Sequence, residues 1–332
     1  MSLKNNLAEY EGEKLDEQLN KTPLVCVVGP TASGKSSLAV KLAQKLSGEI
    51  ISADSMQIYK YMNIGTAKPT AAEMCGIPHH LIDFIPPDKL FTVADYVKLA
   101  RQKINEVTKQ NKLPILTGGT GLYISSVADN IIFSESPSNT KLRAELKAIS
   151  DEQGNEFMLN MLNEIDPILA KTLHPNNSGR VLRGIEIYKL TGTTMTEHKR
   201  LSRLRESPYK LCMLGLNFKN RETLYARIDA RVDAMISLGL VDEVRELIKM
   251  GYSKTSVQAI GYKEFFDYLN GKCSLQEAVD CVKQETRKYA KRQLTWFRRD
   301  ERINWIYADE FEDNDLILQE ALKLINKNTG GI

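Results

Sequence analysis

One eight-residue stretch near the amino end constrains the fold of this 332-residue chain more than any other feature. Residues 29–36, Gly-Pro-Thr-Ala-Ser-Gly-Lys-Ser, match the pattern G-x-x-x-x-G-K-S/T. An apolar run at 24–28 precedes the stretch, and residues 37–46 after it are apolar at helical spacing. Because a short continuous apolar run is typical of a strand buried on both faces, the order strand, loop and helix predicts a phosphate-binding loop (P-loop).

The residue types of this loop suit a diphosphate or a nucleotide such as ATP. Glycines let successive backbone N–H groups point at phosphate oxygens, and the start of the following helix adds a favourable dipole. Lys35 supplies a positive charge to the phosphates, and the Ser36 hydroxyl can ligate Mg²⁺, the expected cofactor. The loop does not say which bond is broken. The predicted phosphate-binding residues are Gly29, Pro30, Thr31, Ala32, Ser33, Gly34, Lys35 and Ser36.

Strands and helices alternate through the first part of the chain, as in a parallel sheet with helices on both faces. Further strands are expected at 49–53, 80–85 and 113–116. Gly48 is placed as the C-cap of the first helix, and Thr92 with Asp95 forms a capping box for a helix reaching about residue 111. The sequence predicts an α/β fold, a P-loop-type parallel sheet core flanked by helices.

The alternation of predicted strands and helices ends at about residue 128, and helical patterns follow it. This predicts a helical insertion domain at 129–207 between the two parts of the core, 23–128 and 208–332. A strand at 210–216 is expected to return to the sheet. Helices should follow at 221–249, 256–270 and 274–299, and an acidic turn at 309–315 should precede a last helix.

The net charge of +3 hides an uneven distribution of charge along the chain. Segments 171–206 and 281–302 each hold eight Lys or Arg against three acidic residues, so the remainder is acidic. A polyanion such as a nucleic acid would suit two such segments, although solvated helix faces can look the same. The chain has no run of 18 apolar residues and begins with a polar segment, 1–22, so neither a membrane span nor a signal peptide is expected.

Asp54 ends the second predicted strand and is the main candidate for chemistry beside the P-loop. Ligands of such sheets bind at the carboxyl ends of the strands, so Asp54 should face the same crevice as the loop. It could hold Mg²⁺, act as a general base, or simply cap a turn. Gln57, three residues later, carries an amide able to read the edge of a base.

Seven strings of this sequence resemble the tRNA dimethylallyltransferase family, also called tRNA isopentenyltransferases. They occur in the family's order across about residues 23–305. The strings are Gly-Pro-Thr-Ala-Ser-Gly-Lys-Ser (29–36), Ile-Ser-Ala-Asp-Ser-Met-Gln-Ile-Tyr (51–59), Asn-Ile-Gly-Thr-Ala-Lys-Pro (63–69), Pro-His-His-Leu-Ile-Asp (78–83), Gly-Gly-Thr-Gly-Leu-Tyr (118–123), Ile-Gly-Tyr-Lys-Glu (260–264) and Lys-Arg-Gln-Leu-Thr-Trp-Phe-Arg (291–298).

The resemblance implies transfer of the dimethylallyl group from dimethylallyl diphosphate to N6 of adenosine 37 in tRNA, with diphosphate as the leaving group. It implies catalytic roles for Asp54, Thr31 and Arg231, with Asp54 acting on the amine and Arg231 on the diphosphate. The helical insertion would grip the anticodon stem-loop. With tRNA and the diphosphate donor as its partners, the enzyme is expected to be a cytoplasmic monomer.

The resemblance also implies a set of residues that contact tRNA. Its members come from the segment after the second strand, the two basic segments, two other family strings, and positions 143 and 257–259 outside them. They are Asp54, Ser55, Met56, Gln57, Thr120, Arg143, Gly179, Arg180, Val181, Leu182, Arg183, Val257, Gln258, Ala259, Ile260, Gly261, Tyr262, Lys291, Arg292, Gln293, Leu294, Thr295, Trp296, Phe297 and Arg298. Tyr262, Trp296 and Phe297 offer surfaces for stacking on bases, but aromatic residues on helices also pack in the core.

Three alternatives stay open from the residues alone. A P-loop kinase acting on a small metabolite or nucleotide would use the same loop on ATP, but it would not explain 54–57 or 291–298. An adenylate isopentenyltransferase would perform the same chemistry on free AMP without needing two basic segments. A non-enzymatic RNA-binding protein would have no use for an intact P-loop with Asp54.

Overall fold

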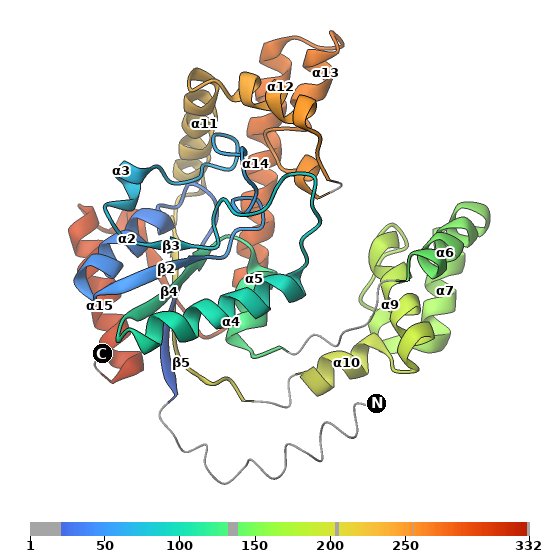
Figure 1. Cartoon of the computed structure of the whole chain (residues 1–332), viewed down its shortest axis with the longest axis horizontal. Coiled ribbons are helices and arrows are strands. Elements are labelled where there is room, and N and C mark those ends of the chain that lie inside the picture. Colours follow the sequence, from blue (N-terminus) through green and yellow to red (C-terminus); the bar gives the residue numbers. More distant parts are fainter. Residues whose placement is uncertain (1–20, 132–138, 203–205, 254, 331–332) are drawn as a thin grey trace. The chain divides into compact units, whose positions relative to one another are not determined.

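The computed structural model describes residues 21–131, 139–202, 206–253 and 255–330 (Figure 1). The chain divides into two compact units, Met1–Ala128 with Pro208–Ile332, and Asp129–Ser207. Most of the polar segment 1–22, and Arg203 and Arg205 of the first basic segment, lie outside the described residues. Among the described helices, none combines the length and the apolar character that a membrane crossing requires.

The larger unit contains a six-stranded sheet in the order β3-β2-β4-β1-β5-β6, in which every neighbouring pair is parallel. The strands are β1 (Thr22–Val28), β2 (Gly48–Ser52), β3 (His79–His80), β4 (Leu113–Gly118), β5 (Tyr209–Asn217) and β6 (Ile303–Tyr307). Strands β2, β3 and β4 all lie on one side of β1, and β5 and β6 lie on its other side. The loop after β1 therefore lies at the point where the strand order reverses. The predicted α/β class is confirmed.

Helices cover both faces of this sheet (Figure 1). On one face, α2 (Lys35–Lys45) and α15 (Asn314–Thr329) pack on the apolar side chains of β1 and β5. On the other, α4 (Val93–Lys109) and α5 (Gly121–Ala128) pack together, and α4 contacts β2 and β4. The remaining helices of this unit are α3 (Ala71–Met74), α11 (Arg221–Ser237), α12 (Leu240–Met250), α13 (Phe265–Leu269) and α14 (Leu275–Phe297), with short 3-10 turns at Ser256–Gln258 and Ala308–Glu310.

Local sequence signals account for several helix boundaries. The predicted capping box at Thr92 is confirmed, because the Asp95 N–H donates to Thr92 Oγ1 at 3.2 Å and the Thr92 N–H donates to Asp95 Oδ2 at 2.9 Å. The expected acidic turn and final helix are also confirmed. There the Asp313 carboxylate accepts hydrogen bonds from the first N–H groups of α15.

Gly48 is not the helix cap that the sequence predicted. The helix α2 ends at Lys45, Ser47 takes the left-handed conformation with φ 49°, and Gly48 is the first residue of β2. A β-carbon on Gly48 would lie 2.8 Å from the Leu113 carbonyl oxygen. Glycine is therefore needed here because β2 and β4 approach closely, and not because a helix ends.

The strand predicted at 80–85 was also wrong, since β3 contains only His79–His80. Leu81 and Asp83 have φ angles of 60° and 59°, which end the extended conformation. The predicted helix at 221–249 is divided at Gly239 (φ 94°) into α11 and α12. The segment 256–270 forms only a 3-10 turn and α13, and β6 was not predicted at all.

The described residues of the smaller unit form helices joined by turns and contain no strand. It comprises α6 (Thr140–Gln153), α7 (Asn155–Ile165), α8 (Pro167–Ala170), α9 (Ser178–Thr191) and α10 (Met195–Ser202) around a small apolar core of its own. The buried Asp166 accepts hydrogen bonds from the Leu169 N–H and from the N–H and hydroxyl of Thr196. These bonds cap α8 and fix the start of α10 to it.

Candidate active site

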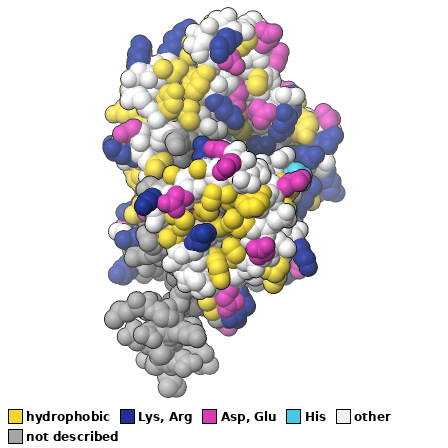
Figure 2. Space-filling model, turned by 90° about the vertical axis from the view of Figure 1, so that its right-hand side faces the viewer, with side chains coloured by type: hydrophobic (Ala, Val, Ile, Leu, Met, Phe, Trp, Pro, Cys, Tyr) yellow, Lys and Arg dark blue, Asp and Glu magenta, His cyan; other side chains and the backbone are white. Residues whose placement is uncertain are grey.

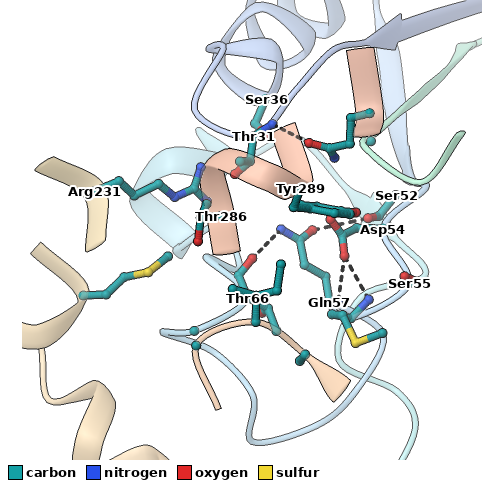
Figure 3. A pocket seen from close by; sticks show the side chains of 18 of the residues that line it. Thr31, Ser36, Ser52, Asp54, Ser55, Gln57, Thr66, Arg231, Thr286 and Tyr289 are labelled. Carbon is teal, nitrogen blue, oxygen red and sulfur yellow. Dashed lines mark hydrogen bonds between the residues drawn. The ribbon is translucent and has the colours of Figure 1, made fainter. Parts of the chain in front are cut away.

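A cavity of about 340 Å³ opens at the carboxyl ends of β1, β2 and β4, within the larger unit (Figure 3). The P-loop contributes Thr31, Lys35 and Ser36 to its wall. The segment after β2 contributes Asp54 through Gln57, and Arg231 reaches in from α11 toward Thr286 of α14. The prediction that Asp54 faces the same crevice as the P-loop is confirmed.

The P-loop has the backbone conformation that its glycines permit. Gly29 and Gly34 have φ angles of 150° and 94°, and Ala32 is also left-handed at 61°. A β-carbon on Gly29 would lie 2.3 Å from the Leu216 carbonyl oxygen, so only glycine lets the loop start this close to β5. The Lys35 ammonium donates to the Pro30 carbonyl at 3.2 Å and so lies across the mouth of the loop.

Two cations of the cavity have lowered pKa values. The pKa of Lys35 is lowered to about 8, first by burial and then by the charge of Arg231, while the charge of Asp54 opposes the shift. Burial also lowers the pKa of Arg231, against the charges of Asp54 and Glu73. Within the described residues neither cation forms an ion pair. Both are therefore short of negative charge, which the phosphates of a ligand would supply.

The Asp54 carboxylate both caps a turn and lines the cavity. Its Oδ1 accepts hydrogen bonds from the Met56 and Gln57 N–H groups at 2.9 and 3.3 Å, so it does cap a turn. The carboxylate also lines the cavity beside Tyr289, whose pKa is raised first by burial and then by the charge of Asp54 (Figure 3). Oδ1 is held by the backbone, which leaves Oδ2 for a ligand; a part in proton transfer stays a prediction.

Gln293 braces the P-loop from 262 positions away in the sequence. Its Oε1 accepts the Thr31 N–H at 2.9 Å, and its Nε2 donates to the Gly119 carbonyl at 3.0 Å. Next to it, Thr120 Oγ1 accepts the Ser55 N–H at 3.0 Å. One buried glutamine of α14 thus joins the P-loop to the start of α5, and Thr120 joins α5 to the segment after β2.

Comparison with known proteins agrees with this arrangement. Residues 57–300 match the family model described as IPP transferase. The chain belongs to the IPP transferase family. The tRNA dimethylallyltransferase of Caldanaerobacter subterraneus is 48% identical over 292 residues, which is 87% of this chain and 93% of that protein. That of Acetivibrio thermocellus is 48% identical over 298 residues, or 89% and 95% of the two chains.

Solved structures of the IPP transferase family share the fold. The full-length tRNA isopentenylpyrophosphate transferase of Bacillus halodurans has a TM-score of 0.70 at 44% identity, covering 93% of this chain and 97% of that one. A eukaryotic dimethylallyltransferase acting on tRNA has a TM-score of 0.79 at 27% identity, covering 94% and 81%. The predicted family is confirmed.

The family string 291–298 of α14 divides into buried and exposed residues. Gln293 and Phe297 are buried, whereas Lys291, Arg292, Thr295, Trp296 and Arg298 are exposed. Trp296 is 40% exposed and packs against Gly121, where a β-carbon would lie 2.2 Å from the indole. Among the aromatic candidates for stacking, Trp296 therefore keeps a free surface. Phe297 and Tyr262 are 2% and 0% exposed and pack in the core.

Ion pairs account for much of the positive charge of the segment 281–302. Four of its eight cations pair with carboxylates, namely Lys283 with Asp233, Arg287 with Asp229, Lys288 with Glu285 and Arg302 with Asp300. Lys291, Arg292, Arg298 and Arg299 form no ion pair among the described residues. The face drawn in Figure 2 likewise has Lys and Arg side chains in several groups with Asp and Glu between them.

The predicted tRNA contacts of the smaller unit centre on one buried carboxylate. Arg143 and Arg183 both donate to Glu186 Oε2, at 2.8 and 2.9 Å. Burial would raise the pKa of Glu186, but the hydrogen bonds from these arginines outweigh it, so the pKa is lowered. Gly179 and Arg180 are exposed, while the Val181 side chain is in the core of this unit. The Val181 side chain therefore has no exposed surface that a ligand could contact.

The predicted tRNA contacts at 257–262 are partly enclosed. Gln258, Ala259 and Ile260 line the cavity, while Tyr262 is buried behind Gly65. Sequence reasoning missed three residues of this region, Thr66, Glu243 and Tyr289. Thr66 lies within a family string and Tyr289 lies two residues before another, which is the signal that could have found them. Glu243 carries no local signal.

Proposed function

We propose that this chain transfers a dimethylallyl group from dimethylallyl diphosphate to N6 of an adenosine in tRNA, at position 37 beside the anticodon, and releases diphosphate. The observation that carries this proposal is one cavity that brings the buried cations Lys35 and Arg231, which form no ion pair among the described residues, together with the Asp54 carboxylate. Cations suit the departing diphosphate, and a carboxylate suits the attacking amine. Family membership supports tRNA as the acceptor.

The donor diphosphate would lie in the P-loop. The N–H groups at the start of α2 and the Lys35 ammonium would bind its oxygens, and Arg231 would close the other side. The Ser36 hydroxyl and the Asp54 carboxylate line the same cavity, and hard oxygen ligands of this kind suit Mg²⁺ together with substrate phosphates. We propose Mg²⁺ as the cofactor, held by Ser36, where it would neutralise charge on the leaving group.

The acceptor amine needs help from the protein, because its lone pair is delocalised into the adenine ring. Asp54 Oδ2 would accept one N6–H hydrogen bond and align the nitrogen with C1 of the donor. The bond from N6 to C1 then forms as the bond from C1 to the diphosphate oxygen breaks. The displaced proton passes to Asp54, and Lys35 and Arg231 stabilise the charge that develops on the diphosphate.

The target base must leave its stack to reach this cavity, at a cost of a few kcal/mol. Phosphate contacts from Lys291 and Arg292 of α14, from Arg298 directly after it, and from Arg143 and Arg180 of the helical unit would offset that cost. Such contacts make the affinity fall with salt. ATP binding, the monomeric state and the cytoplasmic location stay predictions.

Transfer of labelled groups tests this function directly. The chain is incubated with prenyl-labelled dimethylallyl diphosphate or with γ-labelled ATP, each with tRNA or AMP as acceptor. We expect prenyl label in tRNA only, and no transfer with Lys35→Met. Movement of the γ-phosphate would support the kinase alternative, and prenyl label in AMP would support an adenylate isopentenyltransferase.

A further inference from the structure

One carboxylate outside the cavity holds two family strings together. Glu243 of α12 accepts hydrogen bonds from the Asn63 N–H at 2.8 Å, the Ile64 N–H at 2.9 Å and the Gly65 N–H at 3.0 Å. It also accepts the Tyr262 hydroxyl at 2.7 Å. Within the described residues it forms no ion pair. Three consecutive backbone donors on one side chain fix the conformation of that backbone.

The packing of Tyr262 aims its hydroxyl at this carboxylate. The ring is fully buried against Gly65, where a β-carbon would lie 2.4 Å from Tyr262 Cε2. Burial and then the charge of Glu243 raise the pKa of Tyr262, so the hydroxyl keeps its proton and remains a donor. Gly65 is thus needed for close packing, and the ring and the carboxylate grip the segment 63–65 from two sides.

The next two residues of the held segment orient Gln57. The Thr66 and Ala67 carbonyls accept both amide hydrogens of Gln57 Nε2, at 3.2 and 3.1 Å. Ser52 Oγ donates to Gln57 Oε1 at 3.3 Å. Gln57 lines the cavity beside Thr66 and Asp54 (Figure 3). Because both amide hydrogens are used, the group that Gln57 can offer to a ligand is the remaining acceptor capacity of Oε1.

We propose that Glu243 is a positioning residue for base recognition: by fixing residues 63–67 it holds Gln57 so that Oε1 is offered to the cavity as an acceptor. This inference rests on the proposed function. An acceptor suits the N6 amine of adenine, which donates hydrogen, and repels O6 of hypoxanthine or guanine, which accepts. With Glu243 in place the amide cannot rotate to present its NH₂ group without losing two hydrogen bonds.

The test compares two anticodon stem-loop RNAs that differ at the target base. One carries adenosine and the other inosine, and the dissociation constant of each is measured in the presence of inorganic diphosphate. In Glu243→Ala the loop is released and Gln57 can rotate. We expect the preference for adenosine over inosine to fall about fivefold, the factor that one hydrogen bond of about 1 kcal/mol provides.

Two further variants separate positioning from a general loss of structure. Glu246→Ala changes an exposed glutamate of the same helix whose one ion pair among the described residues is with Lys249, and it should keep the wild-type preference. In a Gln57→Ala background, Glu243→Ala should produce no further change in the preference. Tyr262→Phe removes one donor to Glu243 and keeps the ring, so it should lower the preference by a smaller factor even if Glu243→Ala does not fold.

The outcomes are distinct. An unchanged preference in both Glu243→Ala and Tyr262→Phe would overturn the inference, as would equal weakening of both RNAs in these variants. A wild-type chain that binds the adenosine RNA but never prenylates it would instead contradict the proposed function.

Discussion

The cations of the cavity and those of the helical unit 129–207 are arranged in opposite ways. Lys35 and Arg231 are enclosed, form no ion pair among the described residues, and have lowered pKa values because their charges are costly to bury. Arg143 and Arg183 lie nearer the surface and share the buried carboxylate of Glu186. Without a ligand, the two buried cations of the cavity therefore have no carboxylate paired with them among the described residues, while Arg143 and Arg183 share one within their own unit.

This difference shows what a count of charges can and cannot reveal. The P-loop lies outside both segments rich in Lys and Arg, yet its one lysine is buried and forms no ion pair among the described residues. Within those segments, ion pairs bind many of the cations to the protein itself. Burial without a partner marks a ligand site more sharply than surplus charge does.

Replacing Asp54 by asparagine should have the largest effect. The amide oxygen can still accept the Met56 and Gln57 N–H groups, but the side chain can no longer take a proton. We expect single-turnover transfer to slow by about 10²–10⁴-fold, the usual range for a lost general base, with tRNA affinity nearly unchanged. A rate close to that of the wild type would remove Asp54 from proton transfer and leave it as a turn cap.

The second test measures how stability and diphosphate affinity depend on pH, because both depend on the charge of Lys35. Its folded pKa of about 8 lies below the usual 10.5, so stability of the ligand-free chain should rise as pH increases between these values. Affinity for diphosphate should fall above pH 8, as Lys35 loses its proton. Calorimetry should show about 10–100-fold weaker diphosphate binding to Lys35→Met at pH 7.

Diphosphate itself titrates in this range, so the variant is also the control. The wild-type affinity should decrease more steeply above pH 8 than that of Lys35→Met. Parallel curves would mean that Lys35 does not change its charge in the site.

Replacing two arginines of the helical unit should have the smallest of the expected effects, a change in the salt dependence of tRNA affinity. Arg143→Gln with Arg183→Gln should flatten the dependence of tRNA affinity on salt by a slope of up to about 2, and leave diphosphate binding unchanged. Arg200→Gln is the matched control, because Arg200 pairs with Glu197 in the same unit and is not among the predicted contacts. An equal change of slope in the control variant would show that these arginines act only through general charge.

The parts of the site that follow from local chemistry were predictable from the sequence. The P-loop pattern located the anion-binding turn, and the end of β2 located Asp54 at the same crevice. Strand β6 was missed because its five residues follow the charged segment 298–302 after α14 and include few apolar side chains in a row. Gly48 was misread because a glycine after a helix suits a cap as well as it suits a crowded strand.

Other parts of the site depend on contacts that no local pattern records. Gln293 reaches the P-loop across 262 positions, and Glu243 reaches the segment 63–65 across about 180. Within 291–298, helical spacing decides which residues face the core, so Gln293 and Phe297 are buried, Leu294 is half-buried, and the other residues are exposed. A family resemblance assigns the same role to every residue of the string 291–298 and does not separate the buried residues from the exposed ones.

The position of β1 in the sheet has a consequence for the chain as it leaves the ribosome. β1 pairs with β4 on one side and with β5 on the other, and ninety residues separate Gly118 from Tyr209. The nascent sheet therefore has an unpaired backbone at its centre while the whole helical unit, whose contacts are local, is being synthesised. Because the helical unit precedes β5 in the chain, the sheet closes only after this unit has been made. The unit can bury its apolar side chains in its own core during that delay.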